Sequence, residues 1–101
     1  MPPDLNVTTL TESGNNTVSA GGSINISGTA TDDNELGAIR IELVQVASGE
    51  SEFYEVNLLS GSTSALSYNV NAPNLTGNYL LILTLHDQVN NQVRKEYPIQ
   101  V

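Results

Sequence analysis

The longest alternating run in the chain is Tyr79-Leu80-Leu81-Ile82-Leu83-Thr84-Leu85. Every second residue from Tyr79 to Leu85 is a tyrosine or a leucine, and this period of two is typical of a β-strand with a buried face. Leu80 and Ile82 make the opposite face apolar as well. A strand covered on both sides favours a docked neighbouring domain or a protein partner. The alternative is that the outer aliphatic side chains only favour strand formation.

Shorter alternating sets lie on both sides of this run, and none has the period of a helix. Clusters of Gly, Asn, Asp and Ser separate them, as expected for turns. The pattern predicts an all-β fold, a seven-stranded antiparallel sandwich. We expect Phe53 to face outward. The apolar positions expected to face the core are Leu5 and Val7; Ile24, Ile26 and Ala30; Ile39, Ile41 and Leu43; Tyr54, Val56 and Leu58; Leu66, Tyr68 and Val70; Tyr79, Leu81, Leu83 and Leu85; and Val93, Tyr97, Ile99 and Val101.

Length and charge limit what such a domain does. The 101 residues fit one domain, residues 1–101, with a single core. Three Lys plus Arg stand against eleven Asp plus Glu, and the net charge of −8 argues against a nucleic-acid partner. No apolar run approaches the roughly 18 residues of a transmembrane segment.

Composition also favours a compartment. The absence of cysteine removes disulfides, thiol nucleophiles and thiolate metal sites. Asn, Ser and Thr are abundant while Lys and Arg are scarce, which suits an exported surface protein better than a cytosolic enzyme. The start Met1-Pro2-Pro3 looks like a cut within a longer exported polypeptide, with a signal or lipid anchor left behind.

The segment Leu75-Thr76-Gly77-Asn78-Tyr79 resembles the tyrosine corner of immunoglobulin-like and fibronectin type III-like sandwiches. There, a Tyr hydroxyl turns back to the chain just upstream. Gly77 would permit the close approach, and Leu75 would cover the core beneath the ring. Residues 29–43 and 86–91 resemble bacterial immunoglobulin-like and cadherin-like modules of cell-surface proteins and lipoproteins.

The resemblance implies a fold and a role. The fold would be a Greek-key, immunoglobulin-like sandwich. The role would be a non-catalytic extracellular module for structure, adhesion or protein interaction, located at the cell surface. Its partners would be neighbouring domains of the same chain or another surface protein. The alternative is a carbohydrate-binding accessory module of a polysaccharide-handling system, with a glycan as its ligand.

Acidic loops give one candidate metal site. In this topology the loops after the second and sixth strands lie at one end, beside Asp4 at the start of the first strand. Cadherin-like modules use such a pole to bind calcium and stiffen a domain joint, which the resemblance implies here. Calcium takes six to eight oxygen ligands, whereas the residues by themselves favour ordinary turn chemistry. The candidate ligands are Asp32, Asp33, Asn34, Glu35 and Asp87, with Asn90 and Asn91 nearby.

Catalysis is not expected from these residues. His86 and Asp87 are adjacent in a strand and would point to opposite faces. Asp32 and Asp33 are adjacent in a predicted open loop, where water would keep both ionised, so they make no opposed pair for glycoside hydrolysis. Sugar-binding β-modules rely on exposed aromatic rings, and Phe53 is the one ring expected outside.

Overall fold

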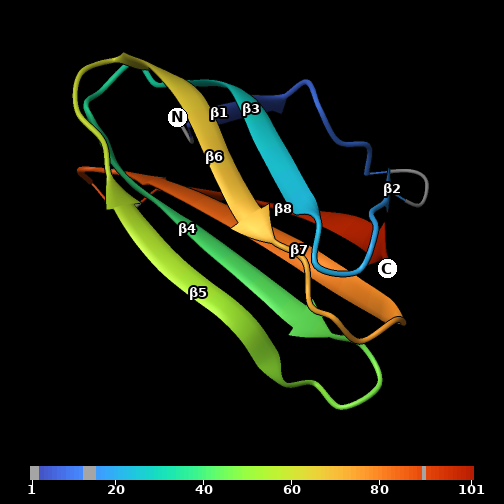
Figure 1. Ribbon diagram of the computed structural model, residues 1–101. Helices are drawn as coiled ribbons and strands as arrows, with labels where there is room; N and C mark the ends of the chain where they lie inside the picture. Colours follow the sequence, from blue (N-terminus) through green and yellow to red (C-terminus); the bar gives the residue numbers. More distant parts are fainter. Residues whose placement is uncertain (1–2, 13–15, 90) are drawn as a thin grey trace.

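The structure is a computed structural model that describes residues 3–12, 16–89 and 91–101. Two β-sheets pack face to face, and the described residues form no helix (Figure 1). Accordingly, no helix among them is long and apolar enough to cross a membrane. The strands are β1 (Asp4–Val7), β2 (Asn16–Thr17), β3 (Ser23–Thr31), β4 (Leu36–Gln45), β5 (Ser51–Leu58), β6 (Thr63–Asn71), β7 (Asn78–Asp87) and β8 (Gln92–Gln100).

The smaller sheet has the strand order β1-β3-β6 and the larger sheet has the order β2-β8-β7-β4-β5. Neighbouring strands are antiparallel, except that β2 runs parallel to β8. The prediction of an all-β sandwich is confirmed. The described residues contain eight strands rather than seven. The additional strand is β2, and its two residues are too few to give an alternating pattern in the sequence.

The core lies between the two sheets and follows the alternation of the sequence. β7 is the centre of the larger sheet, and its residues Leu81, Leu83 and Leu85 are fully buried. Leu80 and Ile82 are half-buried on the other side of the strand, as predicted. The buried core consists of Leu5, Ile24, Ile26, Ala30, Leu36, Ile39, Ile41, Leu43, Leu66, Val70, Ala72, Tyr79, Leu81, Leu83, Leu85, Tyr97 and Ile99.

The predicted orientation of β5 is wrong. Tyr54, Val56 and Leu58 are exposed, whereas Phe53 is half-buried and packs against the core. Phe53 pairs with the buried Leu43 of β4, so pairing sets the Phe side of β5 inward. Because side chains alternate, this choice turns every second residue outward. β5 is an edge strand, and its apolar alternation therefore marks the outer surface instead of the core.

The tyrosine corner is present at the start of β7. The Tyr79 hydroxyl donates a hydrogen bond of 2.7 Å to the backbone oxygen of Leu75, and the Tyr79 side chain is buried. Leu75 itself is exposed, so the expectation that it covers the core is wrong. Gly77 has a φ of 151°, and a Cβ there would meet no atom within 4 Å. Glycine is therefore required for its backbone conformation rather than for a close approach.

Removing the corner hydroxyl is expected to destabilise the fold. Tyr79→Phe should lower the free energy of unfolding by about 1–2 kcal/mol, because the Leu75 carbonyl loses its buried donor. Thermal melts check this value, with Tyr54→Phe as the control because that ring is exposed. Equal melting temperatures for Tyr79→Phe and the wild type would show that the corner contributes nothing to stability.

Candidate cation site at the acidic pole

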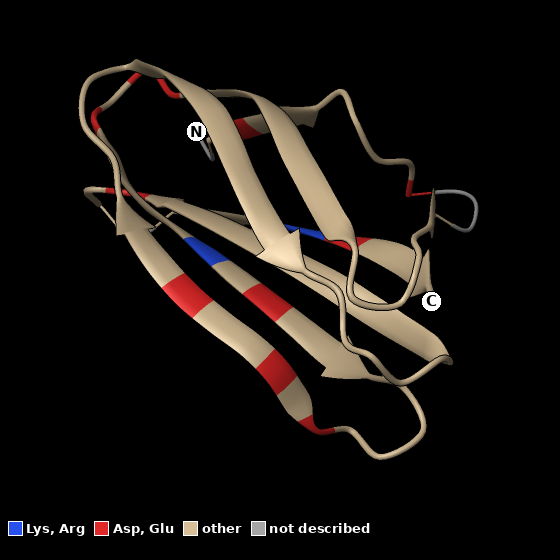
Figure 2. Ribbon diagram, in the orientation of Figure 1, with Lys and Arg blue, Asp and Glu red and all other residues tan. Residues whose placement is uncertain are grey.

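The acidic pole is the end of the sandwich formed by Asp4, residues 32–35 and Asp87. Four strands, β1, β3, β4 and β7, bring these residues together. Asp4 at the start of β1 pairs with Thr31, the last residue of β3. Leu36 at the start of β4 pairs with Asp87 at the end of β7. Figure 2 places the acidic loop between β3 and β4 at the same end as the last residues of β7.

Asp87 is fully buried and serves the turn between β7 and β8. Its Oδ1 accepts hydrogen bonds of 2.9 Å from the backbone amides of Val89 and Asn91, and its Oδ2 accepts one of 3.1 Å from the Asn91 side chain. Burial acts to raise the pKa of Asp87, but the hydrogen bonds, first that of the Asn91 amide, hold it below the ordinary value. The expected turn chemistry is therefore confirmed for Asp87.

Asp32 has a different environment. Its side chain is 9% exposed, and neither carboxylate oxygen accepts a hydrogen bond of good geometry from the described residues. Its backbone amide, by contrast, donates to the Ser62 carbonyl at 2.9 Å. The expectation of an open, solvated loop is wrong for Asp32, because its carboxyl group is buried. The next residue, Asp33, is exposed as expected.

Three carboxyl groups meet around Asp32. The Asp33 and Asp87 side chains lie within hydrogen-bonding reach of it. Burial, followed by these two contacts, raises the pKa of Asp32, and the nearby Asn34 amide acts in the opposite direction. The contact with Asp32 lowers the pKa of Asp33. Because like charges repel, a proton shared by these oxygens, or a metal cation between them, would stabilise the group.

The other candidate ligands do not join this group. Asn34 and Glu35 are exposed in the loop, and the Glu35 carbonyl accepts a hydrogen bond of 2.9 Å from the Gln88 amide. Asp4 is also exposed. Asn90 lies outside the described residues. Within them, no group of three or more His, Asp or Glu side chains could hold a metal ion. A cation at Asp32 would therefore take further oxygens from backbone or water.

His86 makes no acid–base pair with Asp87. The imidazole is half-buried on the outer side of β7, and its Nδ1 lies 3.3 Å from the backbone oxygen of Asp87 rather than from the carboxylate. The carboxylate points the other way, toward Val89 and Asn91. The prediction that these neighbours face opposite sides is confirmed.

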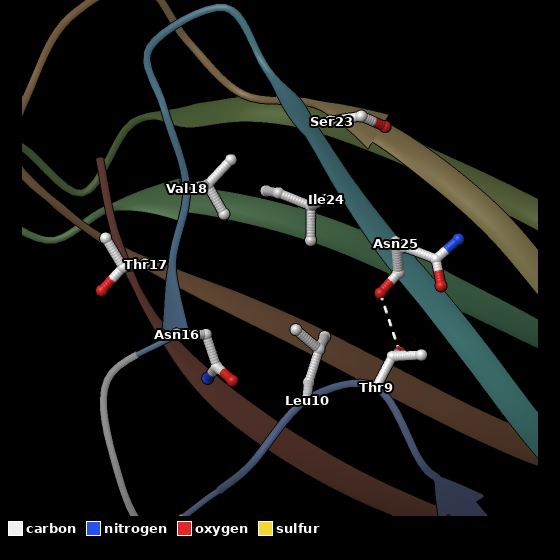
Figure 3. Close-up of a pocket in the computed structure, with 8 residues that line it drawn as sticks. All are labelled: Thr9, Leu10, Asn16, Thr17, Val18, Ser23, Ile24 and Asn25. Atoms are coloured by element: carbon white, nitrogen blue, oxygen red, sulfur yellow. Dashed lines mark hydrogen bonds between the residues drawn. The ribbon is translucent and has the colours of Figure 1, made fainter.

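A pocket of about 260 Å³ lies elsewhere, beside the start of β3 (Figure 3). Its lining contains no titratable side chain, and the Thr9 hydroxyl in it donates to the Asn25 backbone oxygen at 2.8 Å. Uncharged side chains of this kind offer no general acid or base. The lining residues are Thr9, Leu10, Asn16, Thr17, Val18, Ser23, Ile24 and Asn25.

The apolar outer face was expected from the sequence at Leu80 and Ile82 but not on β5. Phe53, the ring on which sugar binding was weighed, packs against the core, and Tyr54 is exposed in its place. Tyr54, Val56 and Leu58 lie on the same outer face as Leu80 and Ile82, and Arg40 and Glu42 of β4 lie between the two groups. The alternation of residues 53–58 indicated one apolar face of this strand, but that face was expected to point to the core and instead points outward.

No protein-family model matches the chain, and no curated protein matches it.

Proposed function

We propose that the chain is a non-catalytic structural module of an exported bacterial surface protein, and that its acidic pole binds one calcium ion. One observation carries the calcium site: both oxygens of the buried Asp32 carboxylate lack a donor although two further carboxyl groups adjoin it. A cation there would give the Asp32 oxygens the partner that they lack.

We also propose that the sandwich is of the Greek-key, immunoglobulin-like type related to fibronectin type III. Two observations support this. The strand order places β3 between β1 and β6, and β7 between β8 and β4. The Tyr79 hydroxyl bonds back to Leu75, as in the tyrosine corner of such sandwiches.

The chemistry of the pole favours calcium over other cations. The available ligands are all oxygens, and the chain has no cysteine to attract a softer metal. Calcium accepts irregular sets of six to eight oxygens, whereas magnesium requires a near-ideal octahedron. Asp32, which Asp33 and Asp87 adjoin, would supply carboxylate oxygens, and carbonyls or water would complete the shell. The exposed side of Asp33 leaves an entry path.

Calcium bound at the pole would connect the two sheets at this end of the sandwich. The pole joins the first residue of β1, the loop between β3 and β4, and the turn after β7. An ion held between Asp32 and Asp87 would tie the smaller sheet to the larger one at this end. A module stiffened in this way suits a spacer or adhesive array outside the cell, where calcium-binding modules commonly have dissociation constants of about 0.1–1 mM.

Thermal melts in EDTA, in calcium and in magnesium test this proposal. For a Kd of about 1 mM, 10 mM Ca²⁺ stabilises the native state by about 1.4 kcal/mol. That value corresponds to a rise in Tm of about 6–11 °C for a domain of this size. Magnesium at the same concentration should produce a much smaller rise. Identical melts in EDTA and in calcium would contradict the proposal and leave a proton as the species between the carboxyl groups.

A further inference from the structure

The outer face of the larger sheet carries two adjacent rows of charge. It is the side of β8, β7, β4 and β5 that points away from the core. In the first row, Arg94 and Arg40 flank Thr84, which pairs with both. In the second row, Glu96 and Glu42 flank Ile82 in the same way. The rows are two residues apart along each strand, a spacing of about 7 Å.

The two rows together carry no net charge, unlike the rest of this acidic chain. Two of its three basic residues lie in them, opposite an equal number of glutamates, whereas the whole chain has a net charge of −8. Figure 2 shows the alternating blue and red segments on β4 and β8. A second acidic copy is repelled by most of the surface, but the two rows are neutral together. This region therefore offers the least repulsive approach for another copy of the chain.

Apolar side chains adjoin both rows. On β5, Val56 pairs with Arg40 and Tyr54 pairs with Glu42, and both are about half exposed, at 47% and 58%. Leu58 beyond them is 85% exposed. The outer face of the smaller sheet is different, because its side chains hydrogen-bond to one another, as Asn25 does to Asn69 and to Ser27. Contiguous exposed apolar surface is typical of an interaction site.

Arg40 in particular lacks a counterion in the described residues. Its guanidinium donates a long hydrogen bond of 3.4 Å to the Thr84 hydroxyl. Arg94, by contrast, pairs with Glu96 at 2.7 Å along its own strand. Glu42, two residues from Arg40 on β4, forms no ion pair with any residue that the structure describes. Arg40 and Glu42, which carry opposite charges on β4, are therefore both available to pair with charges of another molecule.

We propose that this outer face binds a second copy of the chain across a two-fold axis. The axis lies in the plane of the face, perpendicular to the strands, and passes between the two rows. It exchanges the rows, so Arg40 faces Glu42 of the second copy and Val56 faces Tyr54 of the second copy. Each contact occurs twice, as in any two-fold interface. Aligned packing of two twisted sheets is a common arrangement in sandwiches.

Sedimentation equilibrium of the full chain and of charge variants tests the arrangement. From about 10 μM to 1 mM, we expect the wild type to form dimers reversibly. Arg40→Glu and Glu42→Arg should each weaken the dimer about tenfold or more, because like charges then meet at both symmetric contacts. The double variant should restore it, since the rows are merely exchanged. Glu50→Arg, in the turn after β4 and outside both rows, is the control and should leave the dimer intact.

Three results would overturn the proposal. The first is a wild type that stays monomeric over the whole range, which would assign the face to a different domain or protein. The second is a dimer that tolerates both single variants. The third is a double variant as weak as the single ones, provided that its melting temperature equals that of the wild type.

Discussion

Gly28→Ala should lower the free energy of unfolding by about 3 kcal/mol or more, and the melting temperature by about 12 °C or more. Gly28 lies in β3 and pairs with Val7 of β1 and with Leu66 of β6. A Cβ at this position would lie 1.9 Å from the backbone oxygen of Asn6 and 2.9 Å from the Val7 Cα. Both obstacles are main chain, so no side-chain rotation relieves the clash.

The expected consequence is detachment of β1. That strand contributes the fully buried Leu5 to the core, and losing a buried leucine typically costs about 2–5 kcal/mol. Chemical denaturation measures the free energy, and hydrogen exchange at residues 4–7 locates the change. Thr29→Ala is the matched control, because its side chain on the same strand is exposed. A Gly28→Ala protein within 1 kcal/mol of the wild type would contradict the close strand approach.

Asp32→Asn should have opposite effects in the absence and presence of calcium. In EDTA we expect a higher melting temperature than that of the wild type, because the amide removes one like charge and can donate to the Asp33 or Asp87 carboxylate. In calcium we expect no further rise, since a neutral amide is a much weaker ligand than a carboxylate. Thermal melts of the same preparations in both buffers measure this reversal.

Two outcomes for Asp32→Asn would contradict the account. A calcium response equal to that of the wild type would place the ion elsewhere. A large loss of stability in EDTA would mean that the Asp32 carboxylate has a donor in the folded protein. Glu50→Gln, which also removes one carboxylate but in the turn between β4 and β5, controls for the change in net charge.

Much of the fold could be predicted because most strands have one buried face. In β3 and β7 the alternation of residues such as Ile24 and Ile26, or Leu81 and Leu83, coincides with burial. β5 shows the limit of this reasoning. Both of its faces carry apolar side chains, so alternation alone could not choose between Phe53 and Tyr54. The pairing of Phe53 with Leu43 across the β4–β5 hairpin decided the orientation, and alternation did not reveal the register shift between Leu43 and Val44.

The site was predictable only as a group of loops. Topology correctly brought Asp32 and Asp87 to one end of the sandwich. The sequence could not distinguish Asp32 from Asp33, although one is buried and the other exposed. Nor could it show that Asn91 would satisfy Asp87 while Asp32 stays without a donor. These differences depend on how the loops turn over the ends of the sheets, which no local pattern records.

Calorimetric titration of calcium into the wild type and into Asp32→Asn tests the central claim most directly. The account predicts one ion per wild-type chain with a Kd of about 0.1–1 mM, and no binding in that range to the folded variant. Absence of binding to the wild type, or equal binding by both proteins, would contradict it.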